Sequence, residues 1–190
     1  MKKTLLGQFL KKPRMTGAVC SSSQGLARML VTGIDLEHAK TVAELGPGTG
    51  AVTGTILDSM PPSGRFFAVE LNDDIISTFK ARFPAVKIYN DSAANLPDLL
   101  QRENMETLDA VISGLPWAIF PDDLQKAILD AVTKSLKPGG YFTTFAYLQG
   151  VILPSGQHFR KQLANYFSLV EKSPVVWRNF PPAFVYRCRK

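Results

Sequence analysis

The sequence predicts an α/β protein in which helices cover both faces of a mostly parallel sheet. Three observations support this fold class. Segments with strand-like composition alternate with segments of helical periodicity, a glycine-rich turn follows the first strand, and two strand-like segments without a helix between them end the chain. At 190 residues, 45% of them hydrophobic, the chain is long enough for one domain with a substantial core.

Segments with helical periodicity lie between five expected strands. Pro121 suits the start of the third helix, and the Lys-Pro-Gly-Gly run at 137–140 is typical of a helix end. The expected helices cover residues 50–59, 73–82 and 121–136. The expected strands cover residues 41–45, 65–70, 86–90, 108–113 and 140–147.

Two further strands are expected near the C-terminus, at residues 167–177 and 183–189. The Asn-Phe-Pro-Pro run at 179–182 lies between them and is too short for a helical crossover. Adjacent strands joined in this way are antiparallel. We therefore expect an antiparallel addition to the parallel sheet.

Charge is distributed unevenly along the chain. The net charge is +6. Residues 1–14 carry five basic residues and no acid, residues 15–150 carry 10 basic and 15 acidic residues, and residues 151–190 carry seven basic residues and one acid. An acidic body with basic ends favours an anionic partner, either a membrane surface or a nucleic acid.

The first residues have an amphipathic pattern but are too short to span a membrane. Lys11, Lys12 and Pro13 interrupt the apolar stretch, so we expect a retained segment, not a cleaved signal peptide. As a helix, the segment would suit a headgroup layer, with its lysines flanking an apolar side. Packing of Leu6 and Phe9 on the protein's own domain explains the pattern equally well.

A glycine-rich turn is the most informative motif. Residues 42–50 read Val-Ala-Glu-Leu-Gly-Pro-Gly-Thr-Gly, and the glycines allow the backbone to approach a ligand closely. Glu70 ends the second strand and can accept both hydroxyls of a ribose, a device that NAD enzymes share. Glu44, in place of an apolar strand residue, and Asp91, after the third strand, favour a different cofactor.

These residues resemble the Rossmann-like methyltransferases that use S-adenosylmethionine. The resemblance covers about residues 41–190 and implies a seven-stranded sheet with an antiparallel C-terminal hairpin. It also implies that the glycine-rich turn faces the methionine and ribose parts of the cofactor, that Glu70 holds the ribose, and that Asp91 reads the adenine. The implied cofactor-binding residues are Glu44, Gly46, Gly48, Gly50, Glu70, Leu71, Asp91, Ser92 and Ser113.

The end of the fourth strand bears on the methyl acceptor. Residues 113–117 read Ser-Gly-Leu-Pro-Trp and look like the motif of rRNA adenine dimethyltransferases, but Gly114 replaces the asparagine that would hold an exocyclic amine. Methylation of rRNA adenine therefore stays an alternative. A lipid- or cofactor-binding module without catalysis is the alternative outside the enzymes.

A resemblance to the bacterial phospholipid N-methyltransferases extends over nearly the whole chain, through the motifs at residues 12–14, 17–23, 113–116, 136–140, 145–147 and 179–183. It implies transfer of methyl groups to the amine of phosphatidylethanolamine or, in related enzymes, of ornithine lipids. It also implies a cytoplasmic protein, peripheral on the inner face of the membrane, that binds anionic lipid. We further expect a monomer that binds neither metal nor nucleic acid. Residues 1–32 would form a basic, helical membrane and substrate extension of the single 1–190 domain. The substrate and membrane residues are expected to be Lys2, Lys3, Phe9, Lys11, Lys12, Arg14, Ser22, Ser23 and Arg178.

Three residues are candidates for contact with the reacting amine: Ser113, Trp117 and Tyr147. The Tyr147 phenol, at the end of the fifth strand, can bond the amine and stabilise the methylated cation through its ring. Trp117 can form another wall of such a site. The two cysteines, Cys20 and Cys188, have no metal-ligand spacing and favour a reducing compartment.

Overall fold

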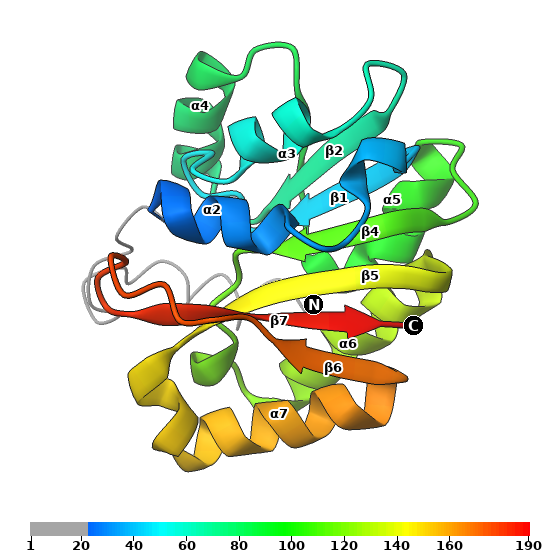
Figure 1. Ribbon diagram of the computed structural model, residues 1–190. Coiled ribbons are helices and arrows are strands. Elements are labelled where there is room, and N and C mark those ends of the chain that lie inside the picture. The colour runs from blue at the N-terminus through cyan, green and yellow to red at the C-terminus, as the bar shows by residue number, and fades with distance from the viewer. Residues whose placement is uncertain (1–22) are drawn as a thin grey trace.

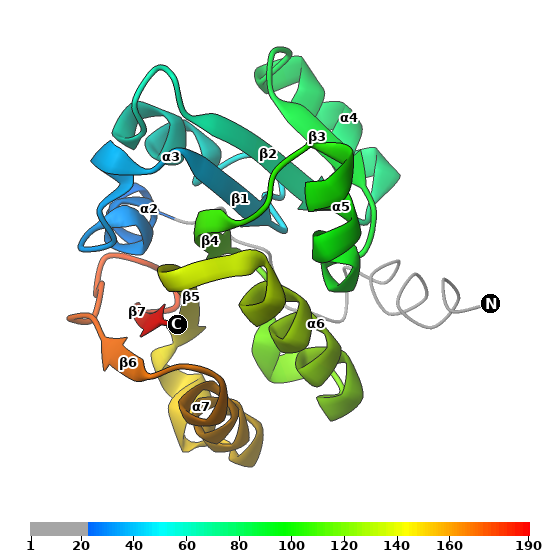
Figure 2. The ribbon, with the colours of Figure 1, turned by 90° about the vertical axis from the view of Figure 1, so that its right-hand side faces the viewer.

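The protein is a seven-stranded sheet with helices on both faces (Figures 1 and 2). The computed structural model describes residues 23–190. The strands are β1 Thr41–Leu45, β2 Arg65–Glu70, β3 Lys87–Asn90, β4 Leu108–Ser113, β5 Leu136–Tyr147, β6 Leu169–Lys172 and β7 Ala183–Arg189. The helices are α2 Gln24–Val31, α3 Thr53–Ser59, α4 Asp73–Arg82, α5 Leu96–Arg102, α6 Asp122–Ser135 and α7 Pro154–Tyr166. Four short 3-10 helices join them, η1 Leu36–His38, η2 Ala93–Asn95, η3 Trp117–Ile119 and η4 Leu148–Ile152.

The strand order is β3-β2-β1-β4-β5-β7-β6. The first five strands pair in parallel, whereas β7 is antiparallel to both of its neighbours, β5 and β6. The predicted mostly parallel sheet with an antiparallel C-terminal hairpin is therefore confirmed. The carboxyl ends of the parallel strands lie on the left in Figure 1, and we call this side of the molecule the carboxyl edge.

Alternating residues of the central strands build two cores, one on each face. Val42 packs with α2 and α3, while its neighbours Ala43 and Leu45 pack with α5 and α6. In β4, Ile112 belongs to the core under α2 and α3, and Val111 belongs to the core under α5 and α6. Both faces of these strands are thus buried, which is the arrangement expected of a parallel sheet between helical layers.

The structure differs from the expected elements most clearly in β5, in two further helices and in β6, and α3 begins at Thr53 and not at residue 50. Strand β5 begins at Leu136, so residues 137–140 lie inside it as an irregularity where the pairing with β4 shifts, and they do not precede it. Gly139 has a φ of 75°, which suits this departure from regular strand geometry. Helices α5 and α7 were not among the expected elements. Strand β6 ends at Lys172, five residues before the end of its expected range.

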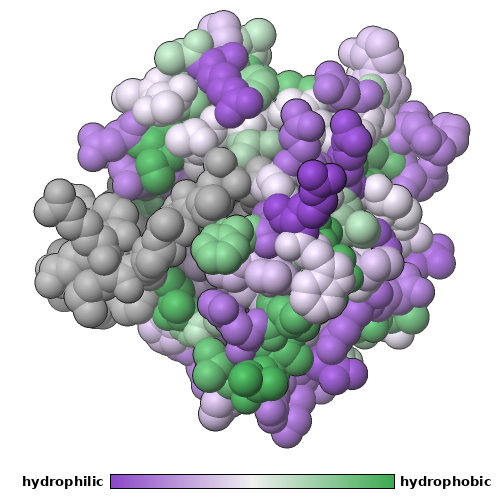
Figure 3. Space-filling model, turned by 60° about the vertical axis from the view of Figure 1, so that its left-hand side comes forward, coloured by the Kyte–Doolittle hydropathy of each residue, from purple (hydrophilic) through white to green (hydrophobic). Residues whose placement is uncertain are grey.

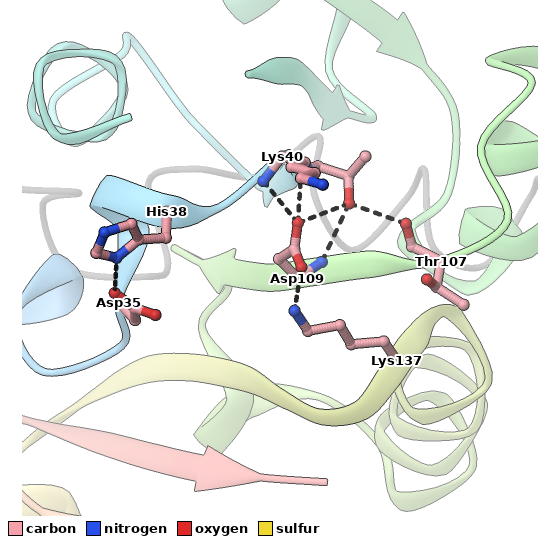
Figure 4. A network of polar contacts seen from close by, with 7 residues as sticks. Asp35, His38, Lys40, Thr107, Asp109 and Lys137 are labelled. Atoms are coloured by element: carbon pink, nitrogen blue, oxygen red, sulfur yellow. Dashed lines mark hydrogen bonds and ion pairs between the residues drawn. The ribbon is translucent and has the colours of Figure 1, made fainter. Parts of the chain in front are cut away.

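A polar network fixes the amino ends of the strands, opposite the carboxyl edge (Figure 4). Asp109 at the start of β4 accepts hydrogen bonds from the backbone N–H groups of Lys40 and Thr41, at 2.7 and 2.9 Å, and forms an ion pair with Lys137. Partial burial acts to raise the pKa of Asp109, but Lys137 and these N–H groups prevail and hold it below its usual value. The network therefore ties β1, β4 and β5 together by a carboxylate.

Candidate functional site

The glycine-rich loop after β1 lies at the carboxyl edge. Gly46, Gly48 and Gly50 have φ angles of 67°, 58° and 83°, a backbone region that side chains other than glycine rarely adopt. A Cβ on Gly50 would lie 2.3 Å from the Phe83 ring, so the loop packs tightly at its end. A Cβ on Gly48 would meet no atom within 4 Å, so the middle of the loop borders open space. The loop therefore leaves room for a ligand next to its backbone.

Glu44 is buried beneath this loop. Its carboxylate accepts a hydrogen bond of 2.6 Å from the hydroxyl of Thr53, in the first turn of α3. Burial, opposed by this hydrogen bond and reinforced by the nearby charge of Glu70, raises the pKa of Glu44 to about 7. Glu44 thus links β1 to α3 directly below the loop. The sequence did not indicate its partner, Thr53.

Glu70 ends β2 beside the same loop. Its Oε1 accepts hydrogen bonds from the N–H groups of Leu71 and Asn72, at 2.8 and 3.1 Å. Burial raises its pKa, while the N–H groups of Asn72, Leu71 and Gly48 act in the opposite direction. The effect of the Gly48 N–H on this pKa indicates that the Glu70 carboxyl group lies near the glycine-rich loop. Leu71 contacts Glu70 through its backbone N–H and not through its side chain.

Asp91 and Ser92 follow β3, the neighbour of β2. The backbone N–H of Asp91 donates to the Glu70 carbonyl at 3.2 Å. The Asp91 carboxylate accepts from the Ser92 N–H and the Asn95 side chain, both at 2.7 Å, and the Ser92 hydroxyl caps η2. The three acidic residues that the sequence analysis singled out therefore lie at or next to the ends of three neighbouring strands, and their contacts with a cofactor stay predictions.

Gly114 brings the end of β4 against the glycine-rich loop. Its N–H donates to the Leu45 carbonyl at 2.8 Å, and a Cβ at this position would lie 2.5 Å from the Gly46 carbonyl oxygen. A side chain does not fit there unless the backbone moves. The glycine that departs from the adenine-methylating motif is therefore required by the contact between these two loops.

Ser113 and Trp117 are buried next to Gly114. The Ser113 Oγ accepts hydrogen bonds from the indole Nε1 of Trp117, at 3.1 Å, and from the Leu115 N–H, at 3.3 Å. A hydroxyl accepts two hydrogen bonds, so these contacts use its acceptor capacity. Phe159 stacks on the Trp117 indole at 4.8 Å between ring centroids. Ser113 therefore positions Trp117, and an amine could not also donate to it while both contacts persist.

An apolar cavity of about 210 Å³ lies between η3, the end of β5, η4 and α7. Its walls carry no charged side chain. The lining residues are Leu115, Pro116, Trp117, Ala118, Ile119, Phe145, Ala146, Tyr147, Gln149, Gly150, Val151, Leu153, Gly156, Phe159 and Tyr186. The cavity is thus next to the β4 and β5 strand ends, where ligands of open α/β sheets gather.

Tyr147 and Trp117, two of the three candidate amine contacts, line this cavity. Tyr147 is half-buried, and its ring meets Phe145 edge to face at 5.3 Å between centroids. The sequence analysis did not find the contributions of Phe159 and Val151, because helix α7 and η4 were not expected. The apolar pair Phe159 and Leu163, four residues apart, was the available signal for α7.

The expected membrane and substrate residues lie mostly outside the described part of the chain. Ser23 is described, and its hydroxyl caps α2 by accepting from the Leu26 N–H at 3.2 Å. Its own N–H donates to the side chain of Asn179. Arg178 is exposed in the β6–β7 loop. The others are Lys2, Lys3, Phe9, Lys11, Lys12, Arg14 and Ser22, in residues 1–22.

Residues 42–140, which hold the loop, the three carboxylates and the β4 end, match the family model described as a methyltransferase domain. An ornithine lipid N-methyltransferase from Singulisphaera acidiphila is 32% identical over 187 residues, which are 97% of this chain and 93% of the relative. The chain belongs to the methyltransferase-domain family. It is an S-adenosylmethionine-dependent methyltransferase.

One further relative matches part of the chain, and two solved structures have the same fold. A ribosomal RNA small subunit methyltransferase A from Dehalococcoides mccartyi is 34% identical over 123 residues, 62% of this chain but only 40% of the relative. An O-methyltransferase from Bacillus cereus, solved with S-adenosylhomocysteine, superposes with a TM-score of 0.71 at 12% identity over 100% of this chain and 92% of that one. TomG from Streptomyces achromogenes, solved with S-adenosylmethionine, gives a TM-score of 0.69 at 16% identity over 97% and 89%.

The residues of this methyltransferase fit its cofactor. The glycine-rich loop borders open space at Gly48, and the Glu70 carboxyl group lies against the same loop, so a ribose there would have an acceptor within reach. S-adenosylmethionine, when bound, supplies an electrophilic methyl group on a sulfonium. We therefore expect the adenosyl group at the β1–β3 ends and the methyl acceptor at the β4–β5 ends.

Proposed function

We propose that this methyltransferase transfers methyl groups to the amine nitrogen of a membrane aminolipid. The observation that carries the proposal is the similarity to an ornithine lipid N-methyltransferase over nearly the full length of both chains. Ornithine lipid is therefore the first acceptor to test. Phosphatidylethanolamine is the second, because the whole-chain motifs resemble those of phospholipid N-methyltransferases.

The cavity at the β4–β5 ends supports an acceptor with an apolar part. Its walls, which include Leu115, Val151 and Phe159, carry no charge that would bind an anionic nucleic acid backbone. The Tyr147 ring lies at the cavity wall, where it can stabilise a methylated ammonium by a cation–π interaction. The Tyr147 phenol can also orient the amine by a hydrogen bond.

The chemistry requires an amine with a free electron pair. A lipid ammonium must lose a proton before it attacks, and water at the cavity mouth can accept that proton. Positioning of the nucleophile then accounts for much of the acceleration. Ser113 contributes by holding Trp117 in the cavity wall, and Gly114 by allowing the β4 end to contact the glycine-rich loop.

Methylation of rRNA adenine is the alternative that the second group of relatives favours. The chain spans about 40% of the rRNA methyltransferase from Dehalococcoides mccartyi. The side chain that this motif uses to hold adenine is absent at Gly114, where a Cβ would lie 2.5 Å from the Gly46 carbonyl oxygen. The missing side chain at Gly114 favours the lipid amine.

The test is incubation of the full chain with methyl-labelled S-adenosylmethionine and a panel of acceptors. The panel contains vesicles with ornithine lipid, vesicles with phosphatidylethanolamine, vesicles of phosphatidylglycerol alone, and ribosomal RNA. We expect label in an aminolipid and none in phosphatidylglycerol, which lacks an amine. Label in RNA alone, or in no acceptor, would overturn the proposal.

A further inference from the structure

Exposed apolar side chains gather at the carboxyl edge. Eight large hydrophobic side chains of residues 23–190 are exposed, and six of them lie at this edge. The exceptions are Leu57, at the end of α3, and Leu169, at the start of β6. The six are Ile119, Leu148, Ile152, Leu153, Trp177 and Phe180. Figure 3, which views the molecule from this side, shows a hydrophobic patch low on the face, where Figure 1 places η4 and the start of α7.

These side chains come from two segments that are joined. Leu148, Ile152 and Leu153 belong to η4 and its end, whereas Trp177 and Phe180 belong to the β6–β7 loop. The N–H of Leu148 donates to the carbonyl of Pro182 at 2.8 Å, which connects the two segments. The exposed fractions of Ile152, Trp177 and Phe180 are 78%, 70% and 83%, whereas the other exposed large hydrophobic side chains are 36% to 50% exposed. We call the surface made by these five residues the apolar rim.

The apolar rim is next to the acceptor cavity. Leu153 belongs to both, and the cavity residues Gly150 and Val151 lie in the same 3-10 helix as Leu148 and Ile152. A hydrocarbon chain lying on the rim would therefore have an apolar route to the cavity. A monomeric soluble protein has little reason to expose such a surface beside its acceptor site.

The segments that carry the rim are basic in sequence, while Asp122, at the start of α6, contacts His158 of the neighbouring α7. Residues 131–170 contain no acidic residue, and Glu171 is the only acid in residues 131–190. Arg178 lies between Trp177 and Phe180 in the sequence, and no ion pair to it exists in the part of the chain that the structure describes. Apolar and aromatic side chains flanked by arginine are the composition of surfaces that lie in an anionic lipid interface.

We propose that the apolar rim inserts into the interface of an anionic lipid bilayer and places the acceptor cavity at the membrane surface. This inference rests on the proposed function, because a bilayer is where an aminolipid acceptor resides. It assigns the contact to residues 148–153 and 177–180, apart from any contact made by residues 1–14. None of the helices in residues 23–190 is long and apolar enough to cross a membrane.

The test compares the variants Leu153→Ser and Leu169→Ser. The two leucines are similarly exposed, at 50% and 46%, but Leu153 lies at the carboxyl edge and Leu169 at the opposite ends of the strands. Binding is measured by sedimentation with phosphatidylcholine vesicles that contain about 30 mol% phosphatidylglycerol, which makes their surface anionic. We expect Ile152→Ser/Leu153→Ser to weaken vesicle binding about tenfold and Ile152→Ser or Leu153→Ser alone to weaken it less, while Leu169→Ser binds like the parent.

Tryptophan fluorescence gives a second measurement. Of the two tryptophans, Trp117 is buried and Trp177 is exposed, so insertion should shift the emission of Trp177 to shorter wavelength and expose it to quenching by brominated lipid. Binding of S-adenosylmethionine to each variant checks that it is folded. Parent-like vesicle binding by Ile152→Ser/Leu153→Ser, with no Trp177 shift in the parent, would overturn the proposed rim.

The experiments distinguish a failure of the apolar rim from a failure of the proposed function. Vesicle binding is measured without methyl transfer, so a rim that binds vesicles while no aminolipid accepts a methyl group leaves the rim intact and refutes the lipid acceptor. Methylation of a short-chain aminolipid, dispersed below its micelle concentration, should be unchanged in Ile152→Ser, because the Ile152 side chain does not line the cavity. Equal loss on dispersed and vesicle substrates would show that the rim acts in catalysis, not in membrane contact, and would overturn the inference.

Discussion

Glu70 is the residue whose position says most about cofactor binding. Its carboxyl group is held by the N–H groups of Leu71 and Asn72 beside the glycine-rich loop. We expect Glu70→Ala to weaken S-adenosylmethionine binding by more than about 1 kcal/mol, because a charged hydrogen-bond acceptor is lost. Isothermal titration checks this, with the exposed Glu106→Ala as the control. Equal affinities in the two variants would mean that the ribose lies elsewhere.

Glu44 should make stability depend on pH. Between pH 4.5, its ordinary pKa, and about 7, its pKa in the fold, the unfolded chain releases the proton while the folded protein keeps it. The stability contribution of Glu44 therefore falls as pH rises through this window. Relative to Glu44→Gln, the parent should lose about 2 to 3 kcal/mol between pH 5 and pH 8, measured by urea unfolding. A difference between the two proteins that does not change with pH would contradict the raised pKa.

Removal of the Tyr147 hydroxyl tests the proposed acceptor site. Tyr147→Phe keeps the ring in the cavity wall and removes the phenol, so we expect kcat/KM for the aminolipid to fall about tenfold with cofactor affinity unchanged. Tyr141→Phe, in the middle of the same strand and outside the cavity lining, is the matched control. If both variants keep parental activity, the phenol does not orient the amine.

The contact between the glycine-rich loop and the β4 end is the decisive feature at the scale of elements. Gly114→Ala places a Cβ 2.5 Å from the Gly46 carbonyl oxygen, so one loop must move. We expect a loss of about 1 to 3 kcal/mol in the free energy of unfolding and weaker cofactor binding. Gly150→Ala, where a Cβ meets no atom within 4 Å, should change neither. Thermal unfolding with and without S-adenosylmethionine measures both effects, and a fully stable Gly114→Ala would show that the loops are not in firm contact.

Elements with strong local signals were predictable from the sequence, and those fixed by distant contacts were not. Strands β1, β2 and β4 have the predicted bounds, because apolar runs between turn residues define them locally. The extension of β5 back to Leu136 depends on pairing with Leu108, a contact with no local signature. The placement of Glu44, Glu70 and Asp91 at or next to three strand ends could be predicted, because each lies at the end of an apolar run in the sequence. The cavity could not, since Phe159 and Tyr186 reach it from α7 and β7.

At the scale of the whole molecule, the basic N-terminal segment and the apolar rim divide the expected membrane contact. Deletion of residues 1–12 removes four of the five basic residues in positions 1–14. We expect weaker binding to anionic vesicles and nearly unchanged cofactor affinity, since the glycine-rich loop and Glu70 are retained. The residual binding should depend less on salt, because fewer charges face the lipid. Equal loss of vesicle and cofactor binding would instead give this segment a structural role.

The central claim is that the methyl group ends on the nitrogen of a membrane lipid. The most direct measurement is tandem mass spectrometry of lipids recovered after the full chain acts on vesicles that contain ornithine lipid and phosphatidylethanolamine, with ribosomal RNA in the same reaction. The account predicts fragments that carry the added methyl groups on the lipid amine. Unmodified lipids together with methylated adenine in the RNA would contradict it.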